Sequence, residues 1–210
     1  MGLNDIFTFE NIQTIGIILG TLAFGVFVAI KTFKKCVAKY LNSDGVSGKI
    51  KAQTNINLMI IKKMEETKEI LNADRIQIFE FHNGGHYANG RSAHKTSCTY
   101  EICRCGVQPY QTQLLDIPLN CIINFTSALL DNEKLSITDI EQIKTTMPAT
   151  YGLKRNMGIK SFFDMIIKNK KGEPVGFIAI QFCTNKYNIN EEVVQKLAWF
   201  VEERLISIMA

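Results

Sequence analysis

Residues 161–183 read SFFDMIIKNKKGEPVGFIAIQFC, and this stretch decides the fold that the sequence predicts. Two runs, 161–168 and 175–183, are rich in Phe, Ile and Val, which favours β-strands. The polar segment between them, 169–174, contains the turn-forming residues Asn, Gly and Pro. Two strands joined by a short polar turn form an antiparallel hairpin. The stretch therefore predicts two neighbouring strands of an antiparallel sheet.

Amphipathic helices are predicted on both sides of this hairpin in the sequence. Residues 190–206 place a stripe of apolar side chains on one helical face: Val193, Leu197, Phe200, Val201 and Leu205. Residues 49–73 do the same with Ile56, Ile60, Met64 and Leu71. This second stripe has two interpretations, core packing or a seam between two copies of the chain. Core packing is the more common use of such a stripe, and we favour it.

Shorter elements are predicted between the two helices. Residues 75–81 alternate polar and apolar side chains, as a strand does, and 97–106 resume this pattern after a polar, glycine-rich loop at 82–91. We also expect a short helix at 118–130, a strand at 135–137, a capping-box-like helix start at 138–141 and a helical or irregular connector at 151–158. The order predicts an α+β domain with one antiparallel sheet and helices packed on it.

An uncharged run of twenty residues, NIQTIGIILGTLAFGVFVAI, occupies positions 11–30. A bilayer core of ~30 Å requires ~20 mostly apolar helical residues, so the run predicts one transmembrane helix. Asp5 and Glu10 precede it without any basic residue, which is not the pattern of a signal peptide. Four lysines follow it: Lys31, Lys34, Lys35 and Lys39. Because basic residues favour the cytoplasmic side of a membrane span, they place the C-terminal domain in the cytoplasm.

The chain is thus divided into four predicted parts. These are an N-terminal extramembrane segment (1–10), the transmembrane helix (11–31), a basic juxtamembrane segment and linker (32–48), and the cytoplasmic domain (49–210). The linker ends in the turn-forming residues 42–48, NSDGVSG, which predict a flexible joint. Gly16 and Gly20 have the spacing of closely packed membrane helices, so a homodimer through this face is one alternative. The other is that glycine is simply common in membrane helices.

Charge and cysteine content narrow the function classes. The net charge is +4, and no basic stripe interleaved with aromatic side chains appears, so we expect no nucleic-acid partner. The six cysteines would suggest disulfides in a secreted protein. In the reducing cytoplasm that the lysines predict, thiols stay free or bind metal.

This order of elements resembles the GAF domain family over residues 49–208. A long helix leads into the strand RIQIFEF (75–81), and the hairpin at 161–183 precedes a closing helix. Gly172 and Gly176 fit the family's strand–turn–strand signature. The resemblance implies a GAF-like antiparallel sheet flanked by N- and C-terminal helices, and it brings no catalytic motif.

A second resemblance concerns residues 81–101, FHNGGHYANGRSAHKTSCTYE. This segment is similar to one in phage-encoded, membrane-anchored proteins of unassigned role. The matching positions are His82, Asn83, Gly84, Asn89, Gly90, Ser97, Thr99 and Glu101.

The same eight residues form the candidate ligand-binding site. Ser97, Thr99 and Glu101 should share one strand face, because strand side chains repeat every two residues. If Phe79 and Phe81 also share that face, polar groups meet an apolar floor, as in small-ligand sites. The alternative is an ordinary long connection between two strands.

Metal binding and catalysis are weaker alternatives. Zinc takes His and Cys ligands, which cluster here as His82, His86, His94, Cys98, Cys103 and Cys105, but no common zinc spacing is present. The residues allow two catalytic arrangements. One is a Cys98 nucleophile with a His82 or His94 base, and the other is a Glu101–Asp164 acid–base pair. However, the sequence lacks the common hydrolase and phosphate-loop motifs.

The sequence thus predicts a membrane-anchored, non-catalytic GAF-like sensor or binding module, phage-encoded by the second resemblance, for a small ligand or a protein partner. The alternative is a viral or membrane-associated structural protein that assembles without a ligand, and a zinc-binding domain or hydrolase is weaker still. A cavity lined by His82, Ser97, Thr99 and Glu101 would favour binding. A cavity filled by Phe79, Phe81, Phe162 or Phe177 would favour assembly. The identities of the ligand, cofactor and partner are left open.

Overall fold

The computed structural model describes the backbone of residues 9–184 and 186–209, and the side chains of 25–35, 48–184 and 186–204. It divides into two compact units, Met1–Thr54 and Asn55–Ala210. Most of the predicted membrane span, including Gly16 and Gly20, lies outside the residues whose side chains are described. Within the described residues, no helix is both long enough and apolar enough to cross a bilayer. The span, its orientation and its glycine face therefore stay predictions.

The first helix, α1, spans Phe9–Leu71. Its backbone is helical through residues 42–48, where the sequence predicts a flexible joint. Intrinsic propensities of Asn, Ser and Gly are a weak guide when helix continues on both sides, which accounts for the difference.

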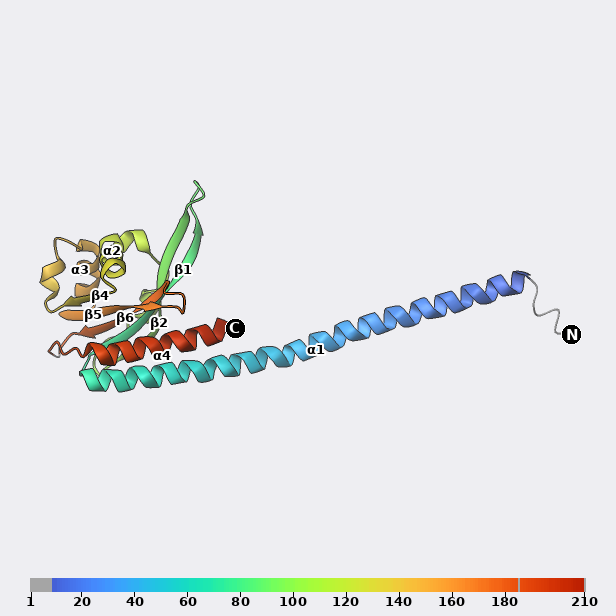
Figure 1. Ribbon diagram of the computed structural model, residues 1–210, viewed down its shortest axis with the longest axis horizontal. Coiled ribbons are helices and arrows are strands. Elements are labelled where there is room, and N and C mark those ends of the chain that lie inside the picture. Colours follow the sequence, from blue (N-terminus) through green and yellow to red (C-terminus); the bar gives the residue numbers. More distant parts are fainter. Residues whose placement is uncertain (1–8, 185, 210) are drawn as a thin grey trace. The chain divides into compact units, whose positions relative to one another are not determined.

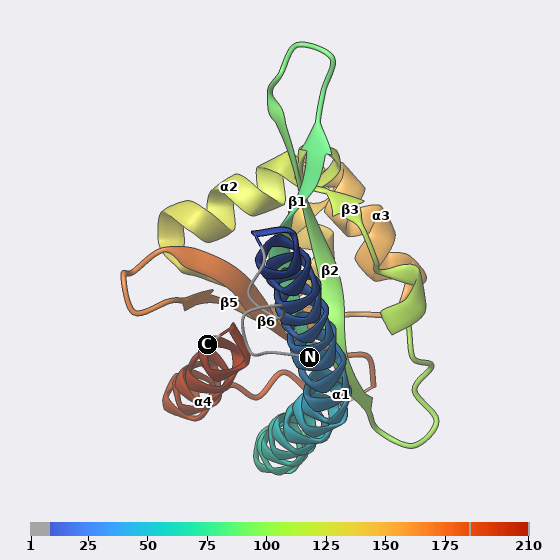
Figure 2. The ribbon, with the colours of Figure 1, turned by 90° about the vertical axis from the view of Figure 1, so that its right-hand side faces the viewer.

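The unit Asn55–Ala210 is built on one antiparallel sheet of six strands in the order β3-β2-β1-β6-β5-β4 (Figures 1 and 2). The strands are β1 (Arg75–His86), β2 (Ser92–Cys103), β3 (Ile117–Pro118), β4 (Lys134–Ile137), β5 (Ser161–Lys168) and β6 (Pro174–Phe182). The predicted hairpin is confirmed, since β5 pairs antiparallel with β6 and places Phe163 opposite Ile180. The predicted α+β class with an antiparallel sheet is likewise confirmed.

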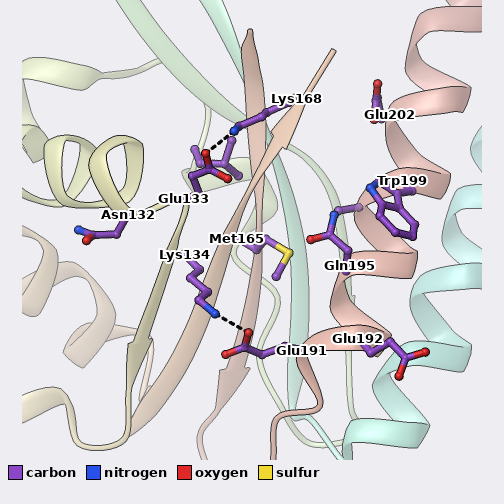
Figure 3. A pocket seen from close by; sticks show the side chains of 12 residues that line it. Asn132, Glu133, Lys134, Met165, Lys168, Glu191, Glu192, Gln195, Trp199 and Glu202 are labelled. Atoms are coloured by element: carbon purple, nitrogen blue, oxygen red, sulfur yellow. Dashed lines mark hydrogen bonds and ion pairs between the residues drawn. The ribbon is translucent and has the colours of Figure 1, made fainter. Parts of the chain in front are cut away.

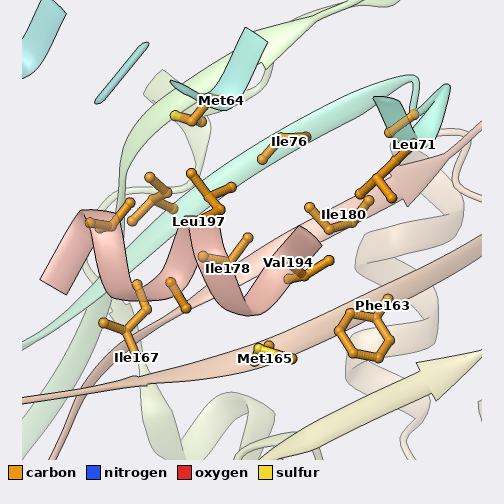
Figure 4. Packing of buried hydrophobic residues seen from close by; sticks show 14 of the residues in the cluster. Met64, Leu71, Ile76, Phe163, Met165, Ile167, Ile178, Ile180, Val194 and Leu197 are labelled. Atoms are coloured by element: carbon orange, nitrogen blue, oxygen red, sulfur yellow. The ribbon is translucent and has the colours of Figure 1, made fainter. Parts of the chain in front are cut away.

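The C-terminal part of α1 and helix α4 (Glu191–Met209) cover one face of the sheet. Figure 4 shows Met64 and Leu71 of α1 and Val194 and Leu197 of α4 around strand side chains such as Ile178. The predicted stripe on residues 49–73 is therefore core packing, with Ile60 and Met64 fully buried. Burial of each such side chain contributes roughly 1.5–3 kcal/mol.

The other face is covered by α2 (Ile123–Asn132), α3 (Pro148–Asn156) and short 3₁₀ turns, η2 (Gln111–Gln113), η3 (Leu119–Ile122) and η4 (Ile140–Ile143). Aromatic side chains dominate the centre of this second core. The rings of Phe79 and Phe177 stack at 4.6 Å, and Phe125 of α2 meets Phe177 edge-on at 5.6 Å. Such pairs add ≈ 0.5–1.5 kcal/mol to the burial of their area.

Half of the polar segment 82–91, residues 82–86, is strand rather than the loop that its composition suggests. His82 pairs with Lys95 and His86 with Ser92, so β1 and β2 continue into a projecting two-stranded hairpin (Figure 2). Cross-strand pairing overrides the low strand propensity of Asn and Gly here. Only residues 87–91 connect the two strands.

Two glycines of the β5–β6 hairpin have specific structural roles. Gly172 has φ +80° in the turn, a conformation that other residues rarely adopt. Gly176 lies so close to β1 that an added Cβ would sit 2.1 Å from the carbonyl oxygen of Phe79. The close approach of β6 to β1 therefore requires a residue without a side chain at position 176.

Candidate functional site

His82 and Ser97 form a polar cluster at the base of the projecting hairpin. His82 Nε2 lies 2.9 Å from Ser97 Oγ, which also accepts a hydrogen bond of 2.8 Å from the backbone N–H of Asp116. The Asp116 carboxylate lies 4.0 Å from the same His82 nitrogen and 3.3 Å from Lys95 Nζ. The structure thus brings His82 and Ser97 together, and it adds Asp116, which the sequence pattern does not reveal.

A β-bulge separates this cluster from Glu101. Ile78 pairs with Tyr100 but the next residue, Phe79, pairs with Cys98, so Thr99 is an extra residue in β2. The bulge interrupts the alternation of faces on which the predicted site rests. As a result, Ser97 lies opposite Glu80, whereas Glu101 lies opposite Gln77. Ser97, Thr99 and Glu101 do not form one polar face.

Glu101 belongs instead to a buried hydrogen-bond network. Its carboxylate lies 3.2 Å from Arg75 Nε and accepts from Gln77 Nε2 at 2.8 Å. It also accepts from the backbone N–H groups of Tyr110 and Gln111, at 2.8 and 2.7 Å. With its side chain only 3% exposed, Glu101 holds the segment after β2 against the sheet rather than facing a ligand.

The remaining predicted residues shape the hairpin backbone. Asn83 Oδ1 accepts from the N–H of Gly85, and Asn89 Oδ1 accepts from the N–H of Arg91. Gly90 adopts φ +79° in the connecting turn. Gly84 approaches the neighbouring strand closely, since an added Cβ would sit 2.6 Å from the carbonyl oxygen of Ala93. These four residues are exposed.

The geometry favours neither a Ser97–His82–Asp116 triad nor the two catalytic arrangements that the sequence allows. In a hydrolytic triad the carboxylate holds the histidine nitrogen remote from the nucleophile, whereas Asp116 lies near the nitrogen that contacts Ser97. Burial, followed by the charge of Glu101, raises the pKa of the Cys98 thiol, which keeps it protonated and unreactive. Glu101 and Asp164 are not neighbours, because β1 and β6 lie between β2 and β5.

The His and Cys cluster does not converge on one point. Among the residues with described side chains, no group of three or more His, Cys, Asp or Glu is placed to hold a metal ion. All five cysteines in that part of the chain are free thiols.

A different site lies between the sheet and helices α2 and α3. A small cavity of about 40 Å³, partly open to solvent, is surrounded by apolar side chains that include Phe79, Leu114, Phe125 and Phe177. Its polar lining residues come from strands and helix: Gln77, Thr96, Thr150, Lys154 and Gln181. None of the eight predicted ligand-binding residues lines this cavity. Sequence reasoning missed it because Thr150 and Lys154 look like ordinary surface residues of a short helix.

Lys154 forms a buried ion pair at the wall of this cavity. Its Nζ donates to Asp164 Oδ2 at 3.0 Å and lies 3.7 Å from the centre of the Phe162 ring. Burial lowers the pKa of Lys154 and raises the pKa of Asp164, and their mutual attraction opposes both shifts. Within the described residues, Thr150 Oγ1 and Asp164 Oδ1 are buried without a hydrogen-bond partner.

Several solved structures share this arrangement of sheet and helices. The blue-light absorbing form of the PixJ GAF domain from Thermosynechococcus elongatus has a TM-score of 0.55 at 10% identity, covering 76% of this chain and 86% of that one. The photoproduct state of GAF3 from Slr1393 of Synechocystis sp. PCC6803 has a TM-score of 0.53 at 12% identity, covering 72% and 96%. A far-red cyanobacteriochrome photoreceptor has a TM-score of 0.52 at 14% identity, covering 80% and 96%. The fold is GAF-like.

At these identities the likeness concerns the fold alone. No protein-family model matches the chain, and no curated protein matches its sequence. The GAF-like domain of this chain has stacked phenylalanines and a small cavity between its sheet and its short helices.

Proposed function

We propose that the protein is a membrane-anchored, non-catalytic GAF-like binding module whose cavity takes a small polar ligand, or the polar headgroup of one. The observation that carries the proposal is made on Thr150, a residue that lines the cavity and whose buried hydroxyl has no hydrogen-bond partner among the described residues. A buried polar atom left without a partner costs about 1–3 kcal/mol. A bound group that supplies the partner would remove this cost.

The size of the cavity limits what it can hold. Pockets for drug-sized ligands measure roughly 300–1,000 Å³, whereas this cavity measures about 40 Å³. One buried water needs roughly 10–15 Å³ by a comparable measure. The space therefore suits one or two waters or a headgroup of that size, with any remaining part of the ligand extending through the opening.

The ion pair at the cavity wall also supports binding. Lys154 and Asp164 are both buried, and hydrophobic residues of similar volume in such positions often give equal or greater stability. Besides its bond to Asp164, the Lys154 ammonium has further N–H groups with which it can donate to a ligand. A small acceptor such as a carboxylate or amide oxygen matches these donors.

The membrane anchor rests on the sequence. The uncharged run at 11–30 has the length of a bilayer span, and the lysines that follow it favour a cytoplasmic position for the GAF-like domain. The ligand or partner would then come from the cytosol.

A Thr150→Val substitution tests the binding proposal, because it replaces the hydroxyl with a methyl group of similar size. Millimolar formate, acetate and acetamide, added to the full chain in detergent micelles, should raise the melting temperature of the wild type more than that of T150V. Thr126→Val is the matched control: Thr126 Oγ1 already donates to the carbonyl oxygen of Ile122 at 3.1 Å. If T150V is more stable than the wild type and no solute shifts either protein, the binding proposal fails.

A second candidate function is assembly at the membrane without an interior ligand. The filling of the second core by Phe79, Phe125 and Phe177 favours it, because these rings occupy space that a larger ligand would need. Native mass spectrometry of the full chain separates the two candidates. A retained small mass supports binding, and an oligomer without a retained mass supports assembly.

A further inference from the structure

The projecting β1–β2 hairpin is basic, and its tip carries Tyr87 and Arg91. Residues 81–95 contain all three histidines of the chain together with Arg91 and Lys95, and no Asp or Glu. The Arg91 guanidinium lies 4.9 Å from the centre of the Tyr87 ring, and the Tyr87 side chain is 38% exposed. In the described part of the chain Arg91 forms no ion pair. Tyrosine and arginine are the residue types that most often anchor protein interfaces.

A groove of complementary charge lies near the opposite edge of the sheet, between β4, β5 and α4 (Figure 3). It has a volume of about 480 Å³ and an apolar floor that includes Met165, Ala198 and Trp199. Trp199 is the single tryptophan of the chain, and it is 61% exposed. An exposed tryptophan beside an open groove is typical of an interaction surface.

The charges of the groove are mostly acidic. Four glutamates and two lysines line it. Three glutamates already have a partner: Glu133 pairs with Lys168, Glu191 with Lys134 and Glu192 with Lys196. Glu202, the fourth, forms no ion pair with any residue that the structure describes. Figure 3 shows it one helical turn from Trp199 on α4.

We propose that the hairpin tip of one copy of this chain docks in the β4–β5–α4 groove of a second copy. Tyr87 would lie against Trp199, and Arg91 would pair with Glu202. The two surfaces carry opposite net charge, and each offers one unpaired group that the other needs. The inference deepens the assembly candidate above and is independent of what the small cavity holds.

The geometry of the contact determines the kind of assembly. Hairpin and groove are different surfaces, so a single contact leaves one free hairpin and one free groove, which either bind further copies or, about a two-fold axis, bind each other. A hairpin tip buries less than the roughly 800 Å² per partner of a standard interface, so the contact should be weak in dilute solution. Tethering to one membrane would raise the effective concentration and favour it.

Because Trp199 is the single tryptophan, its emission reports directly on the groove. With the full chain in detergent micelles, we expect a concentration-dependent blue shift of this emission and a matching rise in sedimentation coefficient. Arg91→Glu and Glu202→Arg should each weaken the association at least tenfold. The control variants Lys171→Glu and Glu203→Arg change exposed charges that do not line the groove or the hairpin, and they should behave as wild type.

Mixing the two weakened variants gives the decisive result. The intact Arg91 of E202R can meet the intact Glu202 of R91E, so an equimolar mixture should recover the association that each variant alone has lost. Circular dichroism shows whether each variant is folded. The proposal is overturned if the folded variants associate like wild type, or if their mixture does not recover the association. It is also overturned if the Trp199 emission of the wild type is independent of concentration. None of these outcomes depends on ligand binding at the small cavity.

Discussion

Lys154 Nζ of α3 lies 3.0 Å from Asp164 Oδ2 of β5, and both side chains are buried. Removing one partner leaves the other charge buried and unpaired, so Lys154→Met should lower the free energy of unfolding by about 3–5 kcal/mol. The double variant K154M/D164L removes both charges and should recover most of this loss. Chemical denaturation of the wild type and the variants measures the difference. A single variant as stable as wild type would show that the pair is not needed for folding.

The same pair predicts a pH dependence. Burial raises the pKa of Asp164 in the folded state, so stability falls as the pH rises above the unfolded value of ~3.9. Burial lowers the pKa of Lys154, so stability rises again as the pH approaches the unfolded value of ~10.4. Relative to K154M/D164L, the wild type should therefore be least stable near neutral pH. A flat difference between pH 4 and 10 would contradict these shifts.

Gly176→Ala should destabilise the sheet by about 3 kcal/mol, because its Cβ would overlap the carbonyl oxygen of Phe79 and force β6 away from β1. Gly152→Ala is a matched control within α3, where an added Cβ meets nothing within 4 Å. There alanine should stabilise the helix by roughly 0.5–1 kcal/mol. Melting temperatures of both variants test the contrast, and equal effects would be inconsistent with the close approach.

Glu101→Ala should free the segment that follows β2. The variant loses the acceptor for the N–H groups of Tyr110 and Gln111 and leaves Arg75 buried without its carboxylate. We expect a loss of about 3 kcal/mol and faster amide hydrogen exchange at 108–114. Glu65→Ala, at an exposed position of α1, is the control. Unchanged exchange at 108–114 in E101A would argue against this role.

Leu22→Arg tests the membrane anchor. An arginine at the centre of a spanning helix costs about 2.5–3.5 kcal/mol, so L22R should release part of the protein from membranes during alkaline extraction. The wild type and the control Leu22→Val should stay in the membrane pellet. Complete extraction of the wild type would rule out the predicted span.

The fold was predictable from the sequence where composition and spacing are distinctive. The runs 161–168 and 175–183 are rich in strand-favouring residues and flank a polar turn, and Ile60, Met64 and Leu71 repeat as one helical face does, so both appear in the structure as expected. The candidate site was not predictable. The extra residue Thr99 puts Ser97 and Glu101 on different faces of the sheet, and no local sequence pattern predicts such a bulge. Likewise, the sequence around Lys154, on a nine-residue helix, predicts a solvent-exposed side chain, whereas the structure shows it buried.

The bulge at Thr99 divides strand β2 into two parts that are subject to different constraints. On one side of it, Glu101 belongs to the closely packed interior network, where almost any substitution is costly. On the other side, Cys98 and Thr96 are still buried, but beyond Phe81 and Lys95 the outer hairpin pairs only with itself. The hairpin tip can therefore change its chemistry over evolution without disturbing the core.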